Sequence, residues 1–355
     1  MRTRPGLVLV AAAALLALAG RAGAHPLSVS YSDWVVEGRA VRAIVRLPLD
    51  DMDLLLRLDR DLDGTVSDTE LAAARDPIAH YMTARITVTA DGVTLAPSPA
   101  AVTRWKDSQG FPYVEAQFTY PAAGSIDAVT LATTVLQDLY AQHRNLGAIA
   151  NGERREEFVF QHGNSYRVRR GMGSGWQTAR SFLALGIEHI FTGYDHILFL
   201  FGLLLVGKGF RNLVAIVTAF TIAHSTTLTL ATLGFVTPAA WTVEGAIALS
   251  IAYVGVENLV STNMSHRWKI AFVFGLVHGF GFANILRGMD LPRSALAISL
   301  FTFNAGVEAG QLAIVGLMVP VLRWIQRTRY HERVIRYASL VIIVMGLYWF
   351  YERVF

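Results

Sequence analysis

The sequence predicts a chain in two parts: a small, mainly-β domain outside the cytoplasm, followed by an all-α bundle of about six transmembrane helices. An apolar leader, short alternating runs up to about residue 166 and long apolar runs from residue 181 predict this organisation. Hydrophobic residues make up 53% of the chain and charged residues 16%, whereas about 25% charged is typical of soluble domains. Much of the chain is therefore expected to lie in lipid.

The first 24 residues have the pattern of a cleavable signal peptide. Two arginines precede the apolar run Leu7–Ala19, and small residues fill Ala22–Ala24, where a signal peptidase would cut. The run is too short to be a membrane span. We therefore expect export of the following domain and a mature N-terminus at His25, whose amine and imidazole together form a weaker candidate metal chelate.

Charge and cysteine content exclude several kinds of partner and site. Three of the 31 basic residues lie in the leader, so 28 remain against 27 acidic residues. This balance gives no support for a nucleic-acid partner. The chain has no cysteine, which excludes disulfides, thiolate metal sites and a cysteine nucleophile. Any metal must be held by nitrogen and oxygen ligands.

Residues 25–166 are expected to form the exported domain. Short runs of alternating polar and apolar residues, separated by Gly, Pro, Asp and Asn, are typical of a small antiparallel sheet or sandwich. The expected strands cover 27–31, 40–47, 85–89, 114–120 and 129–135, and helices are expected at 51–58 and 68–80. Residues 167–180 are expected to be a linker to the transmembrane domain, 181–355.

The two expected helices flank a 12-residue segment with an EF-hand-like pattern. A calcium loop supplies oxygens from positions 1, 3, 5, 7, 9 and 12 and has glycine at position 6 for the turn. Gly64 occupies position 6, and the ligand positions are Asp59, Asp61, Asp63, the Thr65 carbonyl, Ser67 and Glu70. We expect a Ca²⁺ site that acts as a structural staple, because the chain has no partner loop. The alternative is an acidic surface turn.

The second half contains six apolar runs near or above the ~20 residues that cross a bilayer. They are approximately 181–206, 212–233, 240–262, 268–286, 294–322 and 333–351. Most basic residues between them fall on the side opposite the exported domain, in agreement with the positive-inside rule. The sequence thus predicts a multi-pass protein of the cell (inner) membrane, with its N-terminal domain on the periplasmic or extracellular side.

Ionisable and amide side chains within these runs point to a metal site. A charge near the bilayer centre costs about 2.5–3.5 kcal/mol, so such groups are expected to face the bundle interior and mark a site or pathway. On one continuous helix His189 lies nearly over His196, and Glu188 nearly over Asp195. Nitrogen and carboxylate ligands together suit Ni²⁺, Co²⁺ or Zn²⁺. The candidate metal residues are His189, Asp195, His196, His224, Glu257, His278, Asn304 and Glu308.

Several membrane segments resemble the HupE/UreJ membrane proteins. His189–His196 resembles the family motif His-Pro-x-x-Gly-x-Asp-His, with Ile190 in place of the proline. Further segments resemble the longer branch of the family, which carries an exported domain: 223–227, 253–258, 277–283 and 303–312. The resemblance implies a permease for nickel or a related divalent metal, with metalloenzyme maturation proteins as possible partners.

Two other functions stay open at this point. An intramembrane metalloenzyme would use similar residues to hold a metal-activated water. However, the sequence has neither a His-Glu-x-x-His pair nor a Gly-x-Ser-x-Gly turn, so no enzymatic activity is predicted. The other alternative is a metal-sensing or assembly accessory protein whose exported domain binds a partner.

Overall fold

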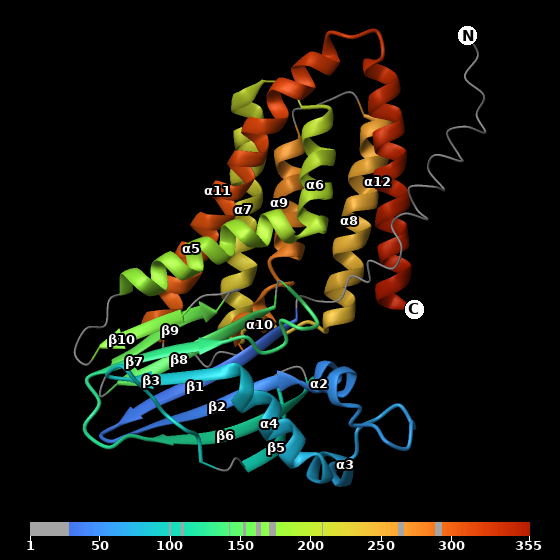
Figure 1. The fold of residues 1–355 in the computed structure, drawn as a ribbon. Coiled ribbons are helices and arrows are strands. Elements are labelled where there is room, and N and C mark those ends of the chain that lie inside the picture. The colour runs from blue at the N-terminus through green and yellow to red at the C-terminus, as the bar shows by residue number, and fades with distance from the viewer. Residues whose placement is uncertain are drawn as a thin grey trace.

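The structure, a computed structural model, describes residues 28–98, 101–107, 110–141, 143–151, 154–160, 165–169, 175–207, 209–261, 266–287 and 293–355. The expected signal peptide and His25 lie outside these residues. A β-rich region lies at one end of a helical bundle, and the C-terminus returns to that same end (Figure 1). This arrangement confirms the mainly-β N-terminal and all-α C-terminal halves.

The β-rich region contains two sheets. The larger has the order β5-β6-β2-β1-β8-β9 and the smaller the order β10-β7-β3-β4. Their strands are β1 (Val29–Glu37), β2 (Ala40–Pro48), β3 (Ile86–Ala90), β4 (Val93–Thr94), β5 (Ala101–Lys106), β6 (Pro112–Pro121), β7 (Ala128–Thr133), β8 (Arg144–Asn151), β9 (Arg154–Phe160) and β10 (Ser165–Arg169). The prediction of an antiparallel sheet is wrong at one place, because β1 and β8 are parallel, with Val29 opposite Arg144.

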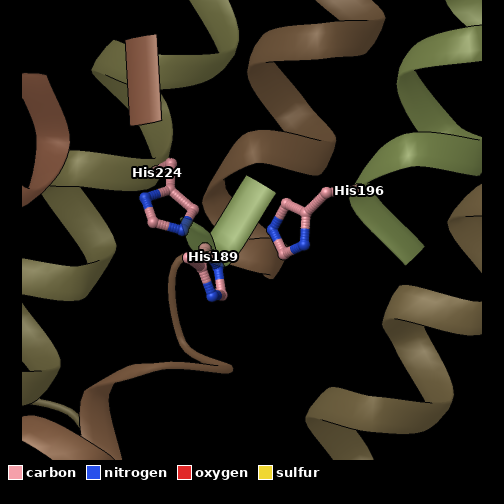
Figure 2. A group of neighbouring side chains, drawn as sticks. All are labelled: His189, His196 and His224. Atoms are coloured by element: carbon pink, nitrogen blue, oxygen red, sulfur yellow. The ribbon is translucent and has the colours of Figure 1, made fainter. Parts of the chain in front are cut away.

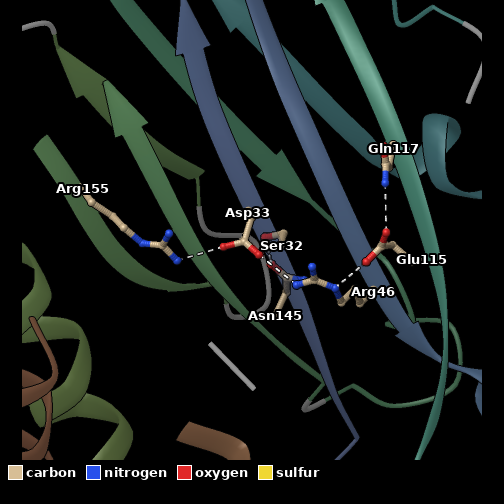
Figure 3. Close-up of polar contacts among 7 residues, drawn as sticks. All are labelled: Ser32, Asp33, Arg46, Glu115, Gln117, Asn145 and Arg155. Atoms are coloured by element: carbon tan, nitrogen blue, oxygen red, sulfur yellow. Dashed lines mark hydrogen bonds and ion pairs between the residues drawn. The ribbon is translucent and has the colours of Figure 1, made fainter. Parts of the chain in front are cut away.

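Successive side chains of β1 point alternately into two different apolar clusters. Trp34 and Val36 enter the core between the sheets, whereas Val29 and Tyr31 belong to the apolar cluster that continues into the helical bundle. On the same face as Tyr31, Asp33 accepts hydrogen bonds from Arg46 and Arg155 (Figure 3). Arg46 also donates to Glu115, at 2.8 Å. These ion pairs neutralise charged groups on a partly covered sheet face.

Three short helices interrupt the strands: α2 (Leu49–Leu56), α3 (Asp68–Ala73) and α4 (Arg75–Arg85). The expected helix at 68–80 is therefore two helices, separated at Ala74. Ser67 and Glu70 form a capping box at the start of α3, in which each side chain accepts from the other's backbone amide. This cap defines the point where the acidic segment ends and the helix begins.

The bundle consists of α5 (Gly175–Thr192), α6 (Tyr194–Leu205), α7 (Phe210–Thr232), α8 (Ala240–Val260), α9 (Arg267–His278), α10 (Ala283–Arg287), α11 (Arg293–Gln326) and α12 (His331–Val354). Within the described residues, four helices are long and apolar enough to cross a bilayer: α7, α8, Leu296–Gln326 of α11, and α12. The remaining two predicted spans are each divided, one between α5 and α6 and the other between α9 and α10. β10 and α5 occupy most of the segment expected to be a linker.

Glycines allow three pairs of helices to pack backbone against backbone. A Cβ on Gly306 of α11 would lie 2.2 Å from the Leu183 carbonyl oxygen of α5, and one on Gly186 would lie 2.0 Å from the Phe303 oxygen. Gly275 makes the equivalent approach from α9 to α7, and Gly346 from α12 to α8. Small residues are the usual means of close helix association in lipid, where apolar burial gives little driving force.

We expect Gly306→Ala to destabilise the bundle by about 1–3 kcal/mol, the usual cost of forcing extra volume into a packed interface. Gly316→Ala on the same helix is the matched control, because a Cβ there meets open space. Thermal unfolding of the purified protein in detergent should show a lower midpoint for Gly306→Ala alone. Equal midpoints for the two variants would contradict the proposed backbone contact.

Candidate metal centre

Three histidines from three helices converge inside the bundle (Figure 2). His189 lies near the end of α5, His196 near the start of α6, and His224 on α7. One ring nitrogen of each lies within 4.8 Å of the other two. The ring centroid of His189 lies 4.6 Å from that of His196 and 6.3 Å from that of His224. The centroids of His196 and His224 are 6.2 Å apart. All three side chains are buried.

A break in the helix brings His189 and His196 together. In a continuous helix, seven residues would separate them by about 10 Å along the axis, which is too far for the rings to meet. Instead α5 ends at Thr192, Gly193 takes an extended conformation, and α6 begins at Tyr194. A Cβ on Gly193 would lie 2.7 Å from the His189 oxygen and 2.9 Å from His196 Nδ1. The turn that assembles the site therefore requires glycine.

His278 extends the cluster from the second divided span. It is the last residue of α9, and its ring centroid lies 5.0 Å from that of His196. Its Nε2 is 3.0 Å from the Ser250 hydroxyl. A Cβ on the next residue, Gly279, would lie 2.3 Å from the His224 carbonyl oxygen, so glycine lets α9 approach α7 at this point. Four histidines thus meet where two helices are interrupted.

Several ring nitrogens of the cluster lack a hydrogen-bond partner, as nitrogens that receive a metal would. Among the described residues, both nitrogens of His189, Nε2 of His196, Nε2 of His224 and Nδ1 of His278 are buried without a hydrogen-bond partner. Native proteins rarely leave buried polar atoms unpaired unless an ion, water or reactant completes them. His224 Nδ1 lies 3.3 Å from Asn304 Oδ1, a contact of the kind that orients metal-binding imidazoles.

Aromatic side chains enclose the cluster. His189 packs on Phe282 and Phe303, and His196 and His224 both contact Phe220. Such a lining excludes water and favours neutral imidazoles, the form that binds metal. A tetrahedral ion with bonds of about 2.0–2.1 Å needs nitrogens about 3.3 Å apart, so modest ring movements would complete its coordination.

The structure places the predicted carboxylates outside the nitrogen cluster. Asp195 accepts two hydrogen bonds of 3.1 Å from Arg353 of α12. Glu257 lies at the far end of the bundle, where it pairs with the fully buried Arg267 at 2.5 Å. Glu308 accepts a hydrogen bond from Thr218, at 2.7 Å. The cluster therefore consists of imidazole rings, with these three carboxylates outside it.

A polar row leads away from the cluster between α7 and α11. His224 contacts Asn304, Thr221 donates to Gln311, and Thr218 donates to Glu308. Thr221 and Thr218 lie about one and two turns before His224, toward the start of α7 at the end of the bundle remote from the sheets (Figure 1). Glu308 Oε2 is buried without a hydrogen-bond partner in the described chain. The row extends about two helical turns from the cluster toward the opposite end of the bundle.

The acidic segment between α2 and α3 brings three predicted calcium ligands together. Carboxylate oxygens of Asp59, Asp61 and Asp63 all lie within 4.8 Å of one another, and Gly64 has a φ of +88°. Asp59 Oδ1 is buried without a partner among the described residues. Glu70 is engaged in the capping box, and hydrogen bonds from the backbone amides of Ser67 and Arg60 lower its pKa to about 2.

The remaining predicted loop ligands lie within the same turn. Thr65 donates from its amide and its hydroxyl to Asp63, and Ser67 donates from both of these groups to Glu70. Neither the capping contact nor the Thr65 contacts use the unpartnered oxygen of Asp59. The residues therefore fit a hard cation, which prefers oxygen ligands on a flexible loop.

Comparison with protein families supplies the identification. A family model described as HupE / UreJ protein matches residues 164–353, more than half of the chain. The chain belongs to the HupE/UreJ family. The match includes α5 to α11 completely and α12 almost to its end, so all four clustered histidines of this HupE/UreJ protein lie within it. With its four span-length apolar helices, it is a membrane protein. Comparisons with curated proteins and with solved structures gave no match.

Sequence reasoning missed the arginine partners of the two carboxylates in the histidine motif. Arg353 pairs with Asp195, and Arg144 of β8 lies 2.5 Å from Glu188. Both acids directly precede a clustered histidine. The sequence carries no clear signal for these pairs, because Arg144 lies between His143 and Asn145 and Arg353 directly follows Glu352.

We expect Gly193→Ala to weaken Ni²⁺ binding by the purified protein at least about tenfold, because the added methyl displaces the His189 backbone or the His196 ring. Thr192→Ala is the control, since the Thr192 hydroxyl only donates to the Glu188 carbonyl. Isothermal titration in detergent would measure both affinities. Unchanged affinity in Gly193→Ala would show that the break does not assemble the binding site.

Proposed function

We propose that this HupE/UreJ protein is a membrane permease for a divalent transition metal, most simply Ni²⁺ or Co²⁺. The observation that carries this proposal is a cluster of four histidines whose buried nitrogens lack partners among the described residues, three of them beside two helix interruptions and His224 within α7. Interrupted helices are typical of transporter binding sites near the middle of the membrane. Imidazole ligands suit borderline divalent ions rather than Mg²⁺ or Ca²⁺.

The polar row between α7 and α11 favours transport over an isolated metal site. A permease must bind an ion strongly enough to replace its water and weakly enough to release it. Neutral imidazoles give moderate affinity, and Glu308 offers a carboxylate farther along the row. In this proposal, the two divided spans complete a six-span bundle, with the β-rich region on the periplasmic or extracellular side.

The direct test is ⁶³Ni²⁺ flux into liposomes containing the purified protein. His196→Ala and His224→Ala should each reduce flux and metal binding at least about tenfold, because each removes a nitrogen ligand. Asp195→Asn should reduce flux less, because Asp195 faces Arg353 rather than the nitrogens. His80→Ala, which changes an exposed histidine of the β-rich region, is the control.

Other outcomes of the flux assay point to the alternative functions. Stoichiometric binding without flux of any tested ion would replace the permease proposal with a metal-sensing or assembly accessory role. Absence of both binding and flux for Ni²⁺, Co²⁺ and Zn²⁺ would remove the metal proposal altogether. Hydrolytic turnover that depends on His196 would favour the metalloenzyme.

We also propose that the loop at residues 59–70 binds Ca²⁺ and stabilises the β-rich region. Its support is the convergence of three aspartates and the unpartnered oxygen of Asp59. A bound ion would hold the connection between α2 and α3 in one conformation. A single loop of this kind suits a structural site of extracellular type.

Millimolar Ca²⁺ should raise the thermal unfolding midpoint of the protein by a few degrees, because a ligand that binds only the folded state stabilises it. Asp61→Ser should remove this shift, since it deletes one of the three convergent carboxylates. Asp76→Ser, which changes an exposed aspartate on α4, is the control. A shift of the same size in all three proteins would mean that Ca²⁺ binds elsewhere.

A further inference from the structure

One residue of the β-rich region reaches the histidine cluster through an ion pair. Arg144 begins β8, and its side chain is 2% exposed. Its guanidinium nitrogen Nη2 lies 2.5 Å from Oε1 of Glu188 on α5. Glu188 directly precedes His189, both of whose ring nitrogens lack a partner in the described structure. A cation from the exported side thus lies next to a site proposed to receive another cation.

The charges around the cluster explain why the position of Arg144 should affect metal binding. The clustered histidines are neutral when they can bind metal, and the two carboxylates adjoining them each have an arginine partner. A divalent ion entering this site would bring a double positive charge into a poorly solvated interior. Burial of such a charge is costly unless an anion compensates it. Glu188, next to His189 in the chain, is a candidate for this role, but Arg144 neutralises it.

We propose that Arg144 controls metal affinity from the β-rich region by competing with the ion for the negative charge of Glu188. This inference rests on the proposed metal site. Among the described residues, the ion pair of Arg144 is with the Glu188 carboxylate, so it is a positioning residue that acts through Glu188 and through its own charge. The β-rich region thereby becomes part of the metal site rather than a separate module.

The competition also couples metal binding to the contact between the β-rich region and the bundle. That contact includes the hydrogen bond from the Thr178 hydroxyl of α5 to the Glu157 carbonyl of β9, at 3.3 Å. If metal weakens the Arg144–Glu188 pair, thermodynamic reciprocity requires that docking through this pair weakens metal binding. Metal occupancy should then loosen β8, β9 and residues 175–188 of α5.

The test uses the full-length protein in detergent and whichever of Ni²⁺, Co²⁺ and Zn²⁺ the wild type binds most tightly. Arg144→Gln should raise affinity at least about fivefold, because it removes a repelling charge and frees Glu188. Glu188→Gln should lower affinity at least about fivefold, because Arg144 then acts uncompensated. The double variant should return to within about twofold of the wild type.

Two further variants separate the charge effect from general damage. Arg144→Lys retains the charge and should stay nearer to the wild-type affinity than Arg144→Gln. Arg46→Gln removes another buried, carboxylate-paired arginine of the same sheet and should leave affinity unchanged. Opposite changes in the Arg144→Gln and Glu188→Gln proteins are not expected from misfolding. Parallel losses in both would overturn the proposal.

Hydrogen exchange of the wild-type protein with and without the ion gives a second readout that needs no variant. Faster exchange in β8, β9 and residues 175–188 upon metal binding would support the competition, and unchanged or slower exchange would overturn it. His224→Ala distinguishes failure of the proposed metal site from failure of the proposed role of Arg144. If that variant binds the ion normally, the proposed metal site itself fails; if it does not, only the role of Arg144 is under test.

Discussion

Contact between helix backbones, made possible by glycine, is the constraint on which this structure depends. Gly186 and Gly306 join α5 to α11, Gly275 and Gly279 join α9 to α7, and Gly346 joins α12 to α8. In lipid, apolar side chains lose little by staying apart, so close packing and internal polar contacts must hold the bundle together. These approaches also bring the end of α9 against the backbone of His224 and place the His278 ring beside His196.

Charge placement defines the chemistry of that space. Arginines pair with the acids that precede two of the histidines, and Arg267 pairs with Glu257 at the opposite end. The groups left to hold a divalent ion in the proposed site are imidazole nitrogens, which are uncharged when they bind metal. This composition is suited to an ion that must leave again, whereas the acidic loop at residues 59–70 is suited to one that remains.

Much of the architecture was predictable because it depends on local pattern. Alternating runs predicted β2 and β6 closely, and apolar length predicted α7, α8, α11 and α12. The histidines were also identifiable, because buried ionisable groups are costly enough to stand out. The helix breaks were not predicted, because Gly193 and Gly279 look like ordinary small packing residues in a single sequence. Without the breaks, a regular helix wrongly aligned Glu188 and Asp195 as a joint carboxylate stripe.

The parallel pairing of β1 with β8 has a consequence for how the molecule assembles. β1 is an interior strand of the larger sheet, yet one of its two neighbours begins only at Arg144, more than a hundred residues later. One edge of β1 therefore stays unpaired during synthesis until most of the β-rich region has been made. Such long-range closure slows folding and exposes strand edges to aggregation. A slow folding phase would follow from this topology alone.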